Sequence, residues 1–506
     1  MNSFSGFVSY GLSILAAIFF LLVLAFVASI VVMYIIDATQ RKDAIRHNFP
    51  VLGRFRYIFQ FLGEFFRQYF FAMDREEMPF NRAERDWVYR AGKNKGNTVA
   101  FGSTKNLNAA GTYIFASCAF PPLDKDAAET AVITIGPYCK QPYDARSFFN
   151  ISGMSYGAIS KPAVQALSKG AEMAGCWINT GEGGLAPYHL ESNADIVFQI
   201  GTAKYGVRKS DGSLDDEKLK KVAGHDQVKM FEVKLSQGAK PGKGGILPAS
   251  KINKDIAEIR GILVNEDSIS PNRHPEISNV SELLDFINHV RDITGKPVGF
   301  KTVIGSPDWI EDLCEEILKR GVESAPDFIT VDGGNGGTGA APMPLMDNVG
   351  LVLKEALPMV SDVLHKYDLR ERVRIIASGK LITPSDVAWA LCTGADFITS
   401  ARGFMFALGC IQSLKCNKNT CPTGVATHQK HLQEGLNPED KAVKVANYAK
   451  NIVHEVEIIA HSCGVLEPRE LRRKHVRIVQ DTGLSIAMDK LYPRPDIKTV
   501  MDKDAV

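Results

Sequence analysis

The sequence predicts an α/β chain whose main domain is a closed (β/α)8 TIM barrel, preceded by one transmembrane helix and an irregular N-terminal layer. Three observations lead to this prediction. The 506 residues include 43 glycines and are 45% hydrophobic, which is typical of a large α/β protein. From about residue 148, short apolar or β-branched runs alternate with helical stretches. Near the N-terminus stands a long run without any charged residue.

The uncharged run, Leu12–Ile36, is long enough to cross a bilayer, because a helix rises about 1.5 Å per residue and the hydrocarbon core is about 30 Å thick. A signal peptide is the alternative, but no basic region precedes the run and no small-residue cleavage site follows it. Basic residues gather between positions 41 and 56, whereas the residues before the run are uncharged. The positive-inside rule therefore predicts a single-pass protein of the cell (inner) membrane, with its N-terminus outside and its catalytic body in the cytoplasm.

Charge and cysteine usage narrow the class of protein further. With 59 basic and 57 acidic residues the net charge is +2, so composition gives no reason to propose nucleic acid as a partner. The nine cysteines are an odd number, and three crowd into residues 410–421. This pattern argues for a reducing compartment and a metal site rather than a disulfide framework.

The chain is expected to divide into four parts. Residues 1–40 are the anchor, residues 41–147 a juxtamembrane and wrapping segment, residues 148–467 the barrel, and residues 468–506 a basic, partly irregular tail. Residues 46–71 mix Arg with many aromatics. Such a segment suits a membrane surface, and an amphipathic helix packed on the body is an equal alternative.

Eight candidate strands indicate a closed barrel. A doubly wound sheet is the rival, but polar and Gly-rich segments follow nearly every strand, as expected when one barrel face carries the whole active site. The candidate strands are Phe149–Met154, Cys176–Thr180, Met230–Leu235, Ile262–Ile269, Val298–Val303, Asp327–Asp332, Val373–Ser378 and Phe397–Ala401.

The three crowded cysteines have the pattern C-x₅-C-x₄-C, at Cys410, Cys416 and Cys421, with Pro422 directly after the last. Three thiolates in one short loop can converge on an iron–sulfur cluster, and three ligands favour a 3Fe–4S over a 4Fe–4S cluster. The spacing does not match the C-x₂₋₄-C pairs of structural zinc sites, although His428 is a distant candidate ligand. Zinc and buried unreactive thiols stay open as alternatives.

Glycine-rich turns follow the last three predicted strands, at Asp332–Pro342, Ala377–Lys380 and Ser400–Gly403. A phosphate needs converging backbone N–H groups, and glycine lets the backbone approach it closely. One such turn is usually only a turn, but three in order predict the phosphate site that barrels place after strands seven and eight. No G-x-G-x-x-G with a following acidic residue opens a βαβ unit, so a dinucleotide-binding fold is unsupported.

Two earlier loops suit a flat ring. Gly153–Ser160 and Asn179–Gly184 place small residues around a hydroxyl and a carboxylate, which allows close stacking with a few hydrogen bonds. Lys301 on the fifth strand has apolar neighbours, so a position against the ring is favoured over a surface lysine. Lys234, Lys240 and Arg260 would suit an anionic substrate, with a solvated basic loop as the alternative.

At these residues the chain resembles the FMN-binding synthase domain of glutamate synthases, and more closely the short, single-chain members of that family. The resemblance runs in one order over residues 152–426 and includes MSYGAIS, NTGEGG, KLSQGAKPGKGG, DGGNGGTGAAP, SARGFMFALGC and CNKNTCPTGVAT. It implies a flavin barrel whose three cysteines hold a 3Fe–4S cluster that passes single electrons to FMN. The residues then expected to bind FMN are Met154, Ser155, Tyr156, Gly157, Thr180, Lys301, Asp332, Gly333, Gly334, Gly336, Gly337, Thr338, Gly379, Ala401, Arg402 and Gly403.

The resemblance also implies a reaction, in which FMN delivers hydride to an imine formed from 2-oxoglutarate and ammonia, giving L-glutamate. Lys234, Lys240 and Arg260 would hold or activate the oxo acid, with Glu182 beside it; Glu182 and Lys234 are the expected catalytic pair. A glutamine that helps to bind the oxo acid in the long enzymes falls at Ile246 here, which leaves the substrate open.

Partners follow from the same resemblance. Too few residues remain for the glutaminase domain of the long enzymes, so ammonia is expected from solution or another subunit. An electron-donor protein is expected without an identity, and self-association is left open. The alternatives are a membrane-tethered FMN oxidoreductase acting on another oxo or hydroxy acid, and a non-catalytic electron-transfer subunit.

Overall fold

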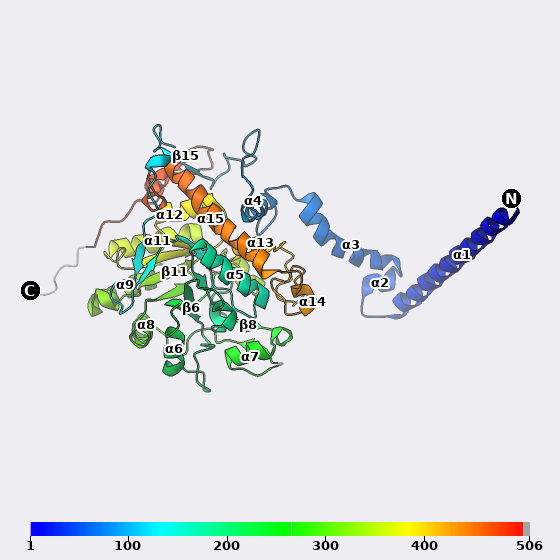
Figure 1. The fold of residues 1–506 in the computed structure, drawn as a ribbon, viewed down its shortest axis with the longest axis horizontal. Helices are drawn as coiled ribbons and strands as arrows, with labels where there is room; N and C mark the ends of the chain where they lie inside the picture. The colour runs from blue at the N-terminus through cyan, green and yellow to red at the C-terminus, as the bar shows by residue number, and fades with distance from the viewer. Residues whose placement is uncertain (1, 265, 499–506) are drawn as a thin grey trace, which may run out of the picture. The chain divides into compact units, whose positions relative to one another are not determined.

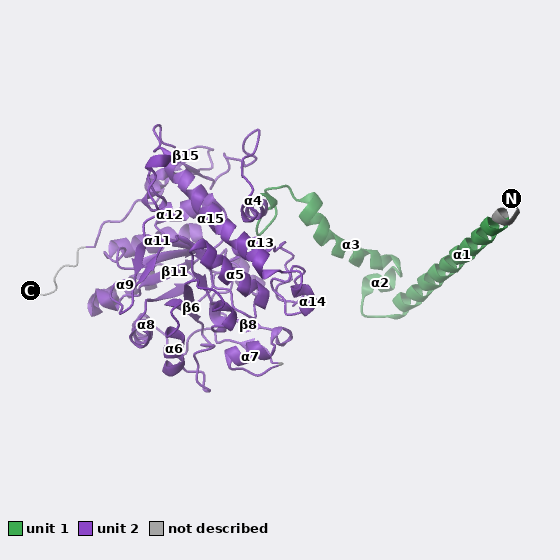
Figure 2. Cartoon of the chain, in the orientation of Figure 1, with its two compact units in different colours: residues 1–83 green, residues 84–506 purple. Residues whose placement is uncertain are grey.

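The computed structural model describes residues 2–264 and 266–498. The chain divides into two compact units, residues 1–83 and residues 84–506, which are coloured separately in Figure 2. The first unit consists of helices, and the second contains the whole barrel.

The first unit contains α1 (Asn2–Thr39), α2 (Ala44–Asn48), α3 (Leu52–Phe66) and a π-helical turn, Arg67–Phe71. Within the described residues, one helix is long and apolar enough to cross a membrane, over Gly6–Thr39. A signal sequence near an N-terminus would meet the same criterion, so the predicted membrane span stays a prediction.

The second unit is built around a closed barrel of eight parallel strands, which confirms the predicted fold class. Each barrel strand pairs with the next barrel strand along the chain, and the last pairs with the first to close the ring. The strands are β4 (Phe149–Ile151), β5 (Ile178–Asn179), β6 (Ile196–Ile200), β7 (Val228–Lys234), β10 (Val298–Thr302), β11 (Phe328–Asp332), β12 (Arg374–Ser378) and β13 (Phe397–Ser400).

Amphipathic helices cover the barrel, and α15 packs along α5, so the helices that follow the last and first strands lie side by side (Figure 1). Local sequence explains where α5 begins and ends: the Ser160 hydroxyl accepts the N–H of Ala163, and Gly175 closes the helix at a φ of 68°. The helices of this unit are α4 (Arg82–Gly92), α5 (Lys161–Ala174), α6 (Asp216–Ala223), α7 (Lys254–Arg260), α8 (Val280–Thr294), α9 (Asp308–Arg320), α10 (Met343–Asn348), α11 (Leu353–Lys366), α12 (Pro384–Thr393), α13 (Arg402–Leu408), α14 (Lys430–Gln433), α15 (Pro438–Ser462) and α16 (Met488–Leu491).

One predicted barrel strand is wrong. The described residues of the segment Ile262–Ile269 lie outside the barrel, and the third barrel strand is Ile196–Ile200, which is not among the predicted strands. The physical reason is burial: all five residues of Ile196–Ile200 are buried, as a strand covered on both faces requires. The run ILVNEDSI at 262–269 instead carries four consecutive polar residues, which a barrel wall cannot cover.

The segment between β7 and α8 forms an excursion at the barrel mouth. It holds α7 and a two-stranded antiparallel sheet, β8 (Ile246–Leu247) with β9 (Ser268–Ile269). Because this excursion follows the carboxyl end of β7, it lies on the face where barrel enzymes carry their active sites.

Segments from both ends of the second unit close its remaining surfaces. In a three-stranded antiparallel sheet, β14 (Val476–Val479) pairs with both β1 (Tyr113–Phe115) and β15 (Ser485–Ala487), so much of the described tail is ordered. The pair β2 (Ile133–Ile135) and β3 (Tyr143–Ala145) packs Ile135, Tyr143 and Ala145 against Trp177, Phe328 and Phe397, beside the starts of barrel strands. The opposite barrel face, at the ends of the strands, carries the loops that follow them.

Candidate active site at the barrel mouth

The loops at the carboxyl ends of the strands enclose two cavities. The first, here the cationic cleft, has a volume of about 570 Å³ and is lined by Ser155, Glu182, Lys240, Arg260 and Cys416, among others. The second, here the glycine-lined pocket, has a volume of about 420 Å³ and lies among the turns after β11, β12 and β13.

The glycine-lined pocket brings together the three turns predicted from sequence to hold a phosphate: Asp332, Gly337, Gly379 and Arg402 all line it. A Cβ at Gly337 would lie 2.8 Å from the Arg402 guanidinium, so glycine lets this cation approach the loop. The Thr399 hydroxyl lines the same pocket and is buried without a hydrogen-bond partner in the described part of the chain. The pocket therefore offers a half-buried cation and an unused hydroxyl, a donor set that fits an anionic group such as a phosphate.

Burial lowers the pKa of the Arg402 guanidinium to about 10, an effect that Asp332 partly offsets. The side chain is still cationic at neutral pH. Lys301 is also buried against this pocket, with its Nζ 3.6 Å from Asp332 Oδ2, so it is not a surface lysine. Two cations near one carboxylate leave the pocket with a positive balance that favours an anionic ligand.

Glu182, which lines the cationic cleft, forms a close ion pair. Lys234 Nζ, at the end of β7, lies 2.9 Å from Glu182 Oε1, in the turn after β5. Burial alone would raise the pKa of the Glu182 carboxyl, but the positive charges of Lys234, Lys240 and Arg260 outweigh it and lower this pKa to about 2. Glu182 is therefore a carboxylate at neutral pH.

A polar chain joins the two cavities. Lys234 Nζ also donates to Gln237 Oε1 at 3.0 Å, and Gln237 Nε2 donates to the carbonyl of Gly337 at 2.9 Å. Gln237 belongs to the motif KLSQGAKPGKGG but has no role predicted from sequence. Its position three residues after a strand-ending lysine is the signal that could have marked it.

The other cations of the cleft are buried side chains, which excludes a solvated basic loop. Arg260 and Lys240 are 5% and 6% exposed, and burial lowers the pKa of both. Arg260 donates to the hydroxyls of Ser155 and Ser268, and its Nε has no hydrogen-bond partner among the residues that the structure describes. Such a guanidinium is prepared for a carboxylate ligand, because an unpartnered buried donor gains a bond when the ligand arrives.

The cysteine loop lies against the cleft. Cys416 lines the cleft beside Thr338, and Lys251 Nζ donates to the carbonyls of Cys416 and Ala158 at 3.1 and 2.9 Å. Gln412, Leu414 and Asn419 take left-handed backbone conformations, with φ of 55° to 58°. Three non-glycine residues in that region within one short loop show that the loop shape is imposed by its surroundings, a pattern common at functional sites.

The three thiols of this loop share one environment. Burial raises the pKa of Cys410 to about 12, and the neighbouring Cys416 and Cys421 contribute to the same rise. Among residues 2–264 and 266–498, no group of three His, Cys, Asp or Glu side chains is arranged to hold a single metal ion. A cluster places different sulfurs on different irons, so its ligands stand farther apart than those of one ion.

Other predicted site residues lie around these cavities without lining them. Gly333 and Gly334 donate their N–H groups to the carbonyls of Ser378 and Leu351, so these donors are used inside the fold. Gly403 lies under the Tyr448 ring, where an added Cβ would meet the hydroxyl. The remaining predicted residues outside both linings are Met154, Tyr156, Gly157, Thr180, Lys234, Cys410 and Cys421. Lining residues without a role predicted from sequence include Lys251, Ser270, Lys380 and Thr399.

One close contact behind the glycine-lined pocket predicts a stability change. An alanine Cβ at Gly238 would lie 1.9 Å from the Gly333 carbonyl oxygen, and backbone on both sides must shift to accept it. We expect Gly238→Ala to lower the free energy of unfolding by about 1–3 kcal/mol, measured as a lower midpoint of thermal unfolding in detergent. Gly435→Ala is the matched control, because no atom lies within 4 Å of its added Cβ. Equal midpoints for the two variants would contradict this packing.

Comparison with known proteins places the chain among its relatives. Residues 110–466 match the family model described as the conserved region in glutamate synthase. The chain is 40% identical over 498 residues to the glutamate synthase large subunit-like protein YerD of Bacillus subtilis, covering 91% of this chain and 94% of that protein.

Alignments with more distant relatives cover a smaller share of this chain. The archaeal glutamate synthase (NADPH) of Methanocaldococcus jannaschii is 34% identical over 333 residues, covering 65% of this chain and 61% of that protein; the chain thus spans less than two thirds of its length. Among solved structures, a mutant flavocytochrome b2 with benzoylformate aligns with a TM-score of 0.46 at 13% identity, over 84% of this chain and 87% of that one. The family model covers most of the chain, and on that ground the protein belongs to the glutamate synthase family.

Proposed function

We propose that this chain is a glutamate synthase-like oxidoreductase that forms L-glutamate from 2-oxoglutarate and ammonia. FMN would occupy the glycine-lined pocket, and Cys410, Cys416 and Cys421 would hold a 3Fe–4S cluster. The observation that carries the proposal is one arrangement: a cleft of buried cations, a carboxylate–lysine pair and a cysteine loop meet beside a pocket suited to a phosphate. FMN supplies hydride transfer when it is bound.

The residues of the chain would divide the remaining work. Arg260 and Lys240 would bind the carboxylates of the oxo acid, and the Arg260 Nε without a partner would gain one. Lys234 presents its ammonium group between Glu182 and Gln237 and would donate a hydrogen bond to the substrate's oxo group or nitrogen. Since Glu182 stays ionised, its negative charge would stabilise ammonium and the protonated imine, both of which are cations.

The thiols and Lys301 fit the same proposal. The buried Lys301 would place its charge at the ring end where negative charge develops on reduction, and Asp332 holds it in place. Cys410, Cys416 and Cys421 would need to lose their protons to bind iron, as thiols do in cluster sites. Electrons would come from a donor protein whose identity the site does not specify.

A second candidate is favoured by one wall of the cleft. Ile246, Leu247 and Pro248 line it, so part of the substrate site is apolar. An oxo or hydroxy acid with one carboxylate and an apolar side chain would fit this wall better than 2-oxoglutarate.

Turnover with defined substrates tests the proposal. We expect purified protein loaded with FMN and a reconstituted cluster to form glutamate from 2-oxoglutarate and ammonia when reduced methyl viologen supplies electrons, with detection by mass spectrometry. Arg260→Met should abolish product formation while the flavin absorption is kept, because this residue lies in the cleft and not in the glycine-lined pocket. Amination of an apolar oxo acid instead of 2-oxoglutarate would favour the second candidate, and no product from any acid would contradict both.

We also propose that α1 crosses the cell (inner) membrane once, with the N-terminus outside. The helix is long and apolar enough, its side chains are exposed, and basic residues follow it. The barrel would then face the cytoplasm, where reduced thiols and low-potential donors occur.

A further inference from the structure

The segment after α1 exposes an aromatic surface that the proposed reaction does not use. In α3, Leu52, Phe55, Phe59, Leu62 and Phe66 recur at spacings of three and four, which places them along one side of the helix. Phe55 and Phe59 are 49% and 66% exposed. More exposed aromatic rings follow in the π-helical turn, at Tyr69, Phe70 and Phe71. Exposed apolar patches of this extent mark a binding surface.

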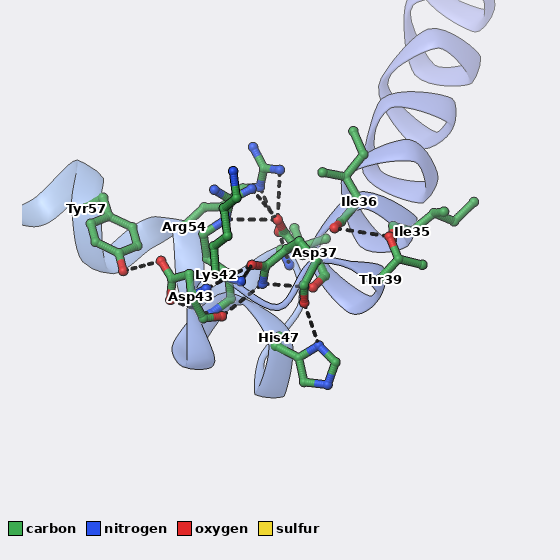
Figure 3. A network of polar contacts seen from close by, with 12 residues as sticks. Ile35, Ile36, Asp37, Thr39, Lys42, Asp43, His47, Arg54 and Tyr57 are labelled. Atoms are coloured by element: carbon green, nitrogen blue, oxygen red, sulfur yellow. Dashed lines mark hydrogen bonds and ion pairs between the residues drawn. The ribbon is translucent and has the colours of Figure 1, made fainter.

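A buried carboxylate ties this segment to the end of α1 (Figure 3). Asp37, in the last turn of α1, accepts hydrogen bonds from Nε and Nη2 of Arg46 in α2 and from Nε and Nη2 of Arg54 in α3, at 2.6 to 2.9 Å. It also accepts the N–H of Val51 at 3.1 Å, and its side chain is fully covered. All three helices therefore meet at one point, and α3 starts where the apolar helix ends.

A second carboxylate supports the same corner. Asp43 caps the first turn of α2 by accepting the N–H groups of Ile45 and Arg46, and it also accepts the hydroxyl of Tyr57 in α3. The path from α1 to α3 is thus held by charged and capping contacts rather than by apolar packing. The aromatic side chains of α3 stay available for another surface.

The net charge of this part of the chain indicates which kind of surface the aromatic side chains bind. Residues 37–71 contain six Lys or Arg and three Asp or Glu, a net charge of +3. Two of the arginines are used by Asp37, whereas the side chains of Arg41, Lys42 and Arg56 are exposed. A basic, aromatic helix beginning at the end of a membrane span meets anionic lipid headgroups first, and each exposed Lys or Arg at such a surface strengthens the attraction.

We propose that residues 41–71, here the basic aromatic segment, bind the surface of an anionic bilayer, with α3 lying in the interface and its aromatic rings among the acyl chains. The inference rests on the proposed span of α1, and it adds a second membrane contact. A protein partner would be the alternative for an aromatic face alone, but it does not account for the excess of basic residues beside the end of the span.

Tryptophan quenching tests the proposal on the full-length protein. Phe59→Trp places a reporter on the aromatic side of α3, and Leu484→Trp is the matched control at a 73% exposed position between β14 and β15. Both variants and the parent protein, whose four tryptophans give the background, are reconstituted into phosphatidylcholine vesicles with 30% phosphatidylglycerol, with and without bromine on the acyl chains. We expect bromine to quench the added tryptophan of Phe59→Trp and to spare that of Leu484→Trp.

Three other outcomes would count against all or part of the proposal. Equal quenching of the two reporters by aqueous acrylamide, without bromine quenching at position 59, would overturn the proposal. Shielding of position 59 from both quenchers would show that protein covers the helix. Bromine quenching that is unchanged in pure phosphatidylcholine would overturn the anionic part. Failure of the proposed span is distinguishable, because alkaline carbonate would then strip the protein from the vesicles, whereas a spanning helix stays in the bilayer.

Discussion

Cys416→Ser is expected to remove the iron–sulfur absorption and to reduce donor-driven glutamate formation to background, while the bound flavin is retained. Serine keeps the size of the side chain but supplies no thiolate, so one corner of the proposed cluster is lost. Cys416 also lines the cationic cleft, which places the proposed cluster next to the substrate site. The measurement is a visible absorption spectrum with iron and flavin content per chain, followed by the methyl viologen assay.

Cys118→Ser provides the control for that experiment. Cys118 is an exposed free thiol far from the cysteine loop in sequence, and it should keep both the spectrum and the activity. Full iron content in Cys416→Ser would contradict the proposed ligand set. Loss of iron with unchanged turnover would instead show that electrons reach the flavin by another route.

Glu182→Gln is expected to reduce kcat/KM on the order of 100-fold, which is the typical effect of removing one aligned charge or donor from an active site. The amide matches the carboxylate in shape and can still accept a hydrogen bond from Lys234, but it carries no negative charge to form the ion pair or to stabilise a cationic imine. Steady-state kinetics measures the effect. The matched control is Glu217→Gln on α6, where the side chain is 82% exposed. A kcat/KM equal to that of the control would remove Glu182 from the mechanism.

The same variant carries a pH prediction. The pKa of Glu182 is lowered from 4.5 to about 2, so its charge contributes fully above pH 4.5 and is lost only as the pH falls toward 2. The ratio of wild-type to Glu182→Gln activity is therefore expected to stay constant from pH 5 to pH 8. A ratio that shrinks as the pH falls through this range would show that the carboxyl titrates there, and that the surrounding cations do not control it.

Much of the barrel could be predicted because its strands are short apolar runs followed by polar loops. The segments around Val298–Thr302 and Phe328–Asp332 show this pattern, and the structure places both in the ring. The strand Ile196–Ile200 was missed because a run of five apolar or amide residues carries no period that distinguishes strand from buried helix. The wrongly predicted strand lies in the excursion between β7 and α8. β-branched residues there pair only in a short sheet outside the barrel.

Part of the site was also within reach of the sequence. Glycine-rich turns after consecutive strands must meet at one end of a parallel barrel, so Gly337, Gly379 and Arg402 were expected to share a pocket. Gln237 and Thr399 could not be assigned in this way. Gln237 matters because of the atoms that lie within about 3 Å of its side chain, and Thr399 because its hydroxyl lacks a partner among the described residues. Neither property can be recognised from the local sequence.

The amino-acid sequence by itself determined seven of the eight barrel strands, the apolar N-terminal helix and the crowding of three cysteines, because these depend on neighbours along the chain. Only the tertiary structure decided that Glu182 and Arg260, from separate parts of the chain, line one cleft and that Lys234 pairs with Glu182 there. It also decided that Asp37 is covered by two arginines. Electrostatic interaction depends on distance and burial, and folding sets both between residues far apart in the sequence.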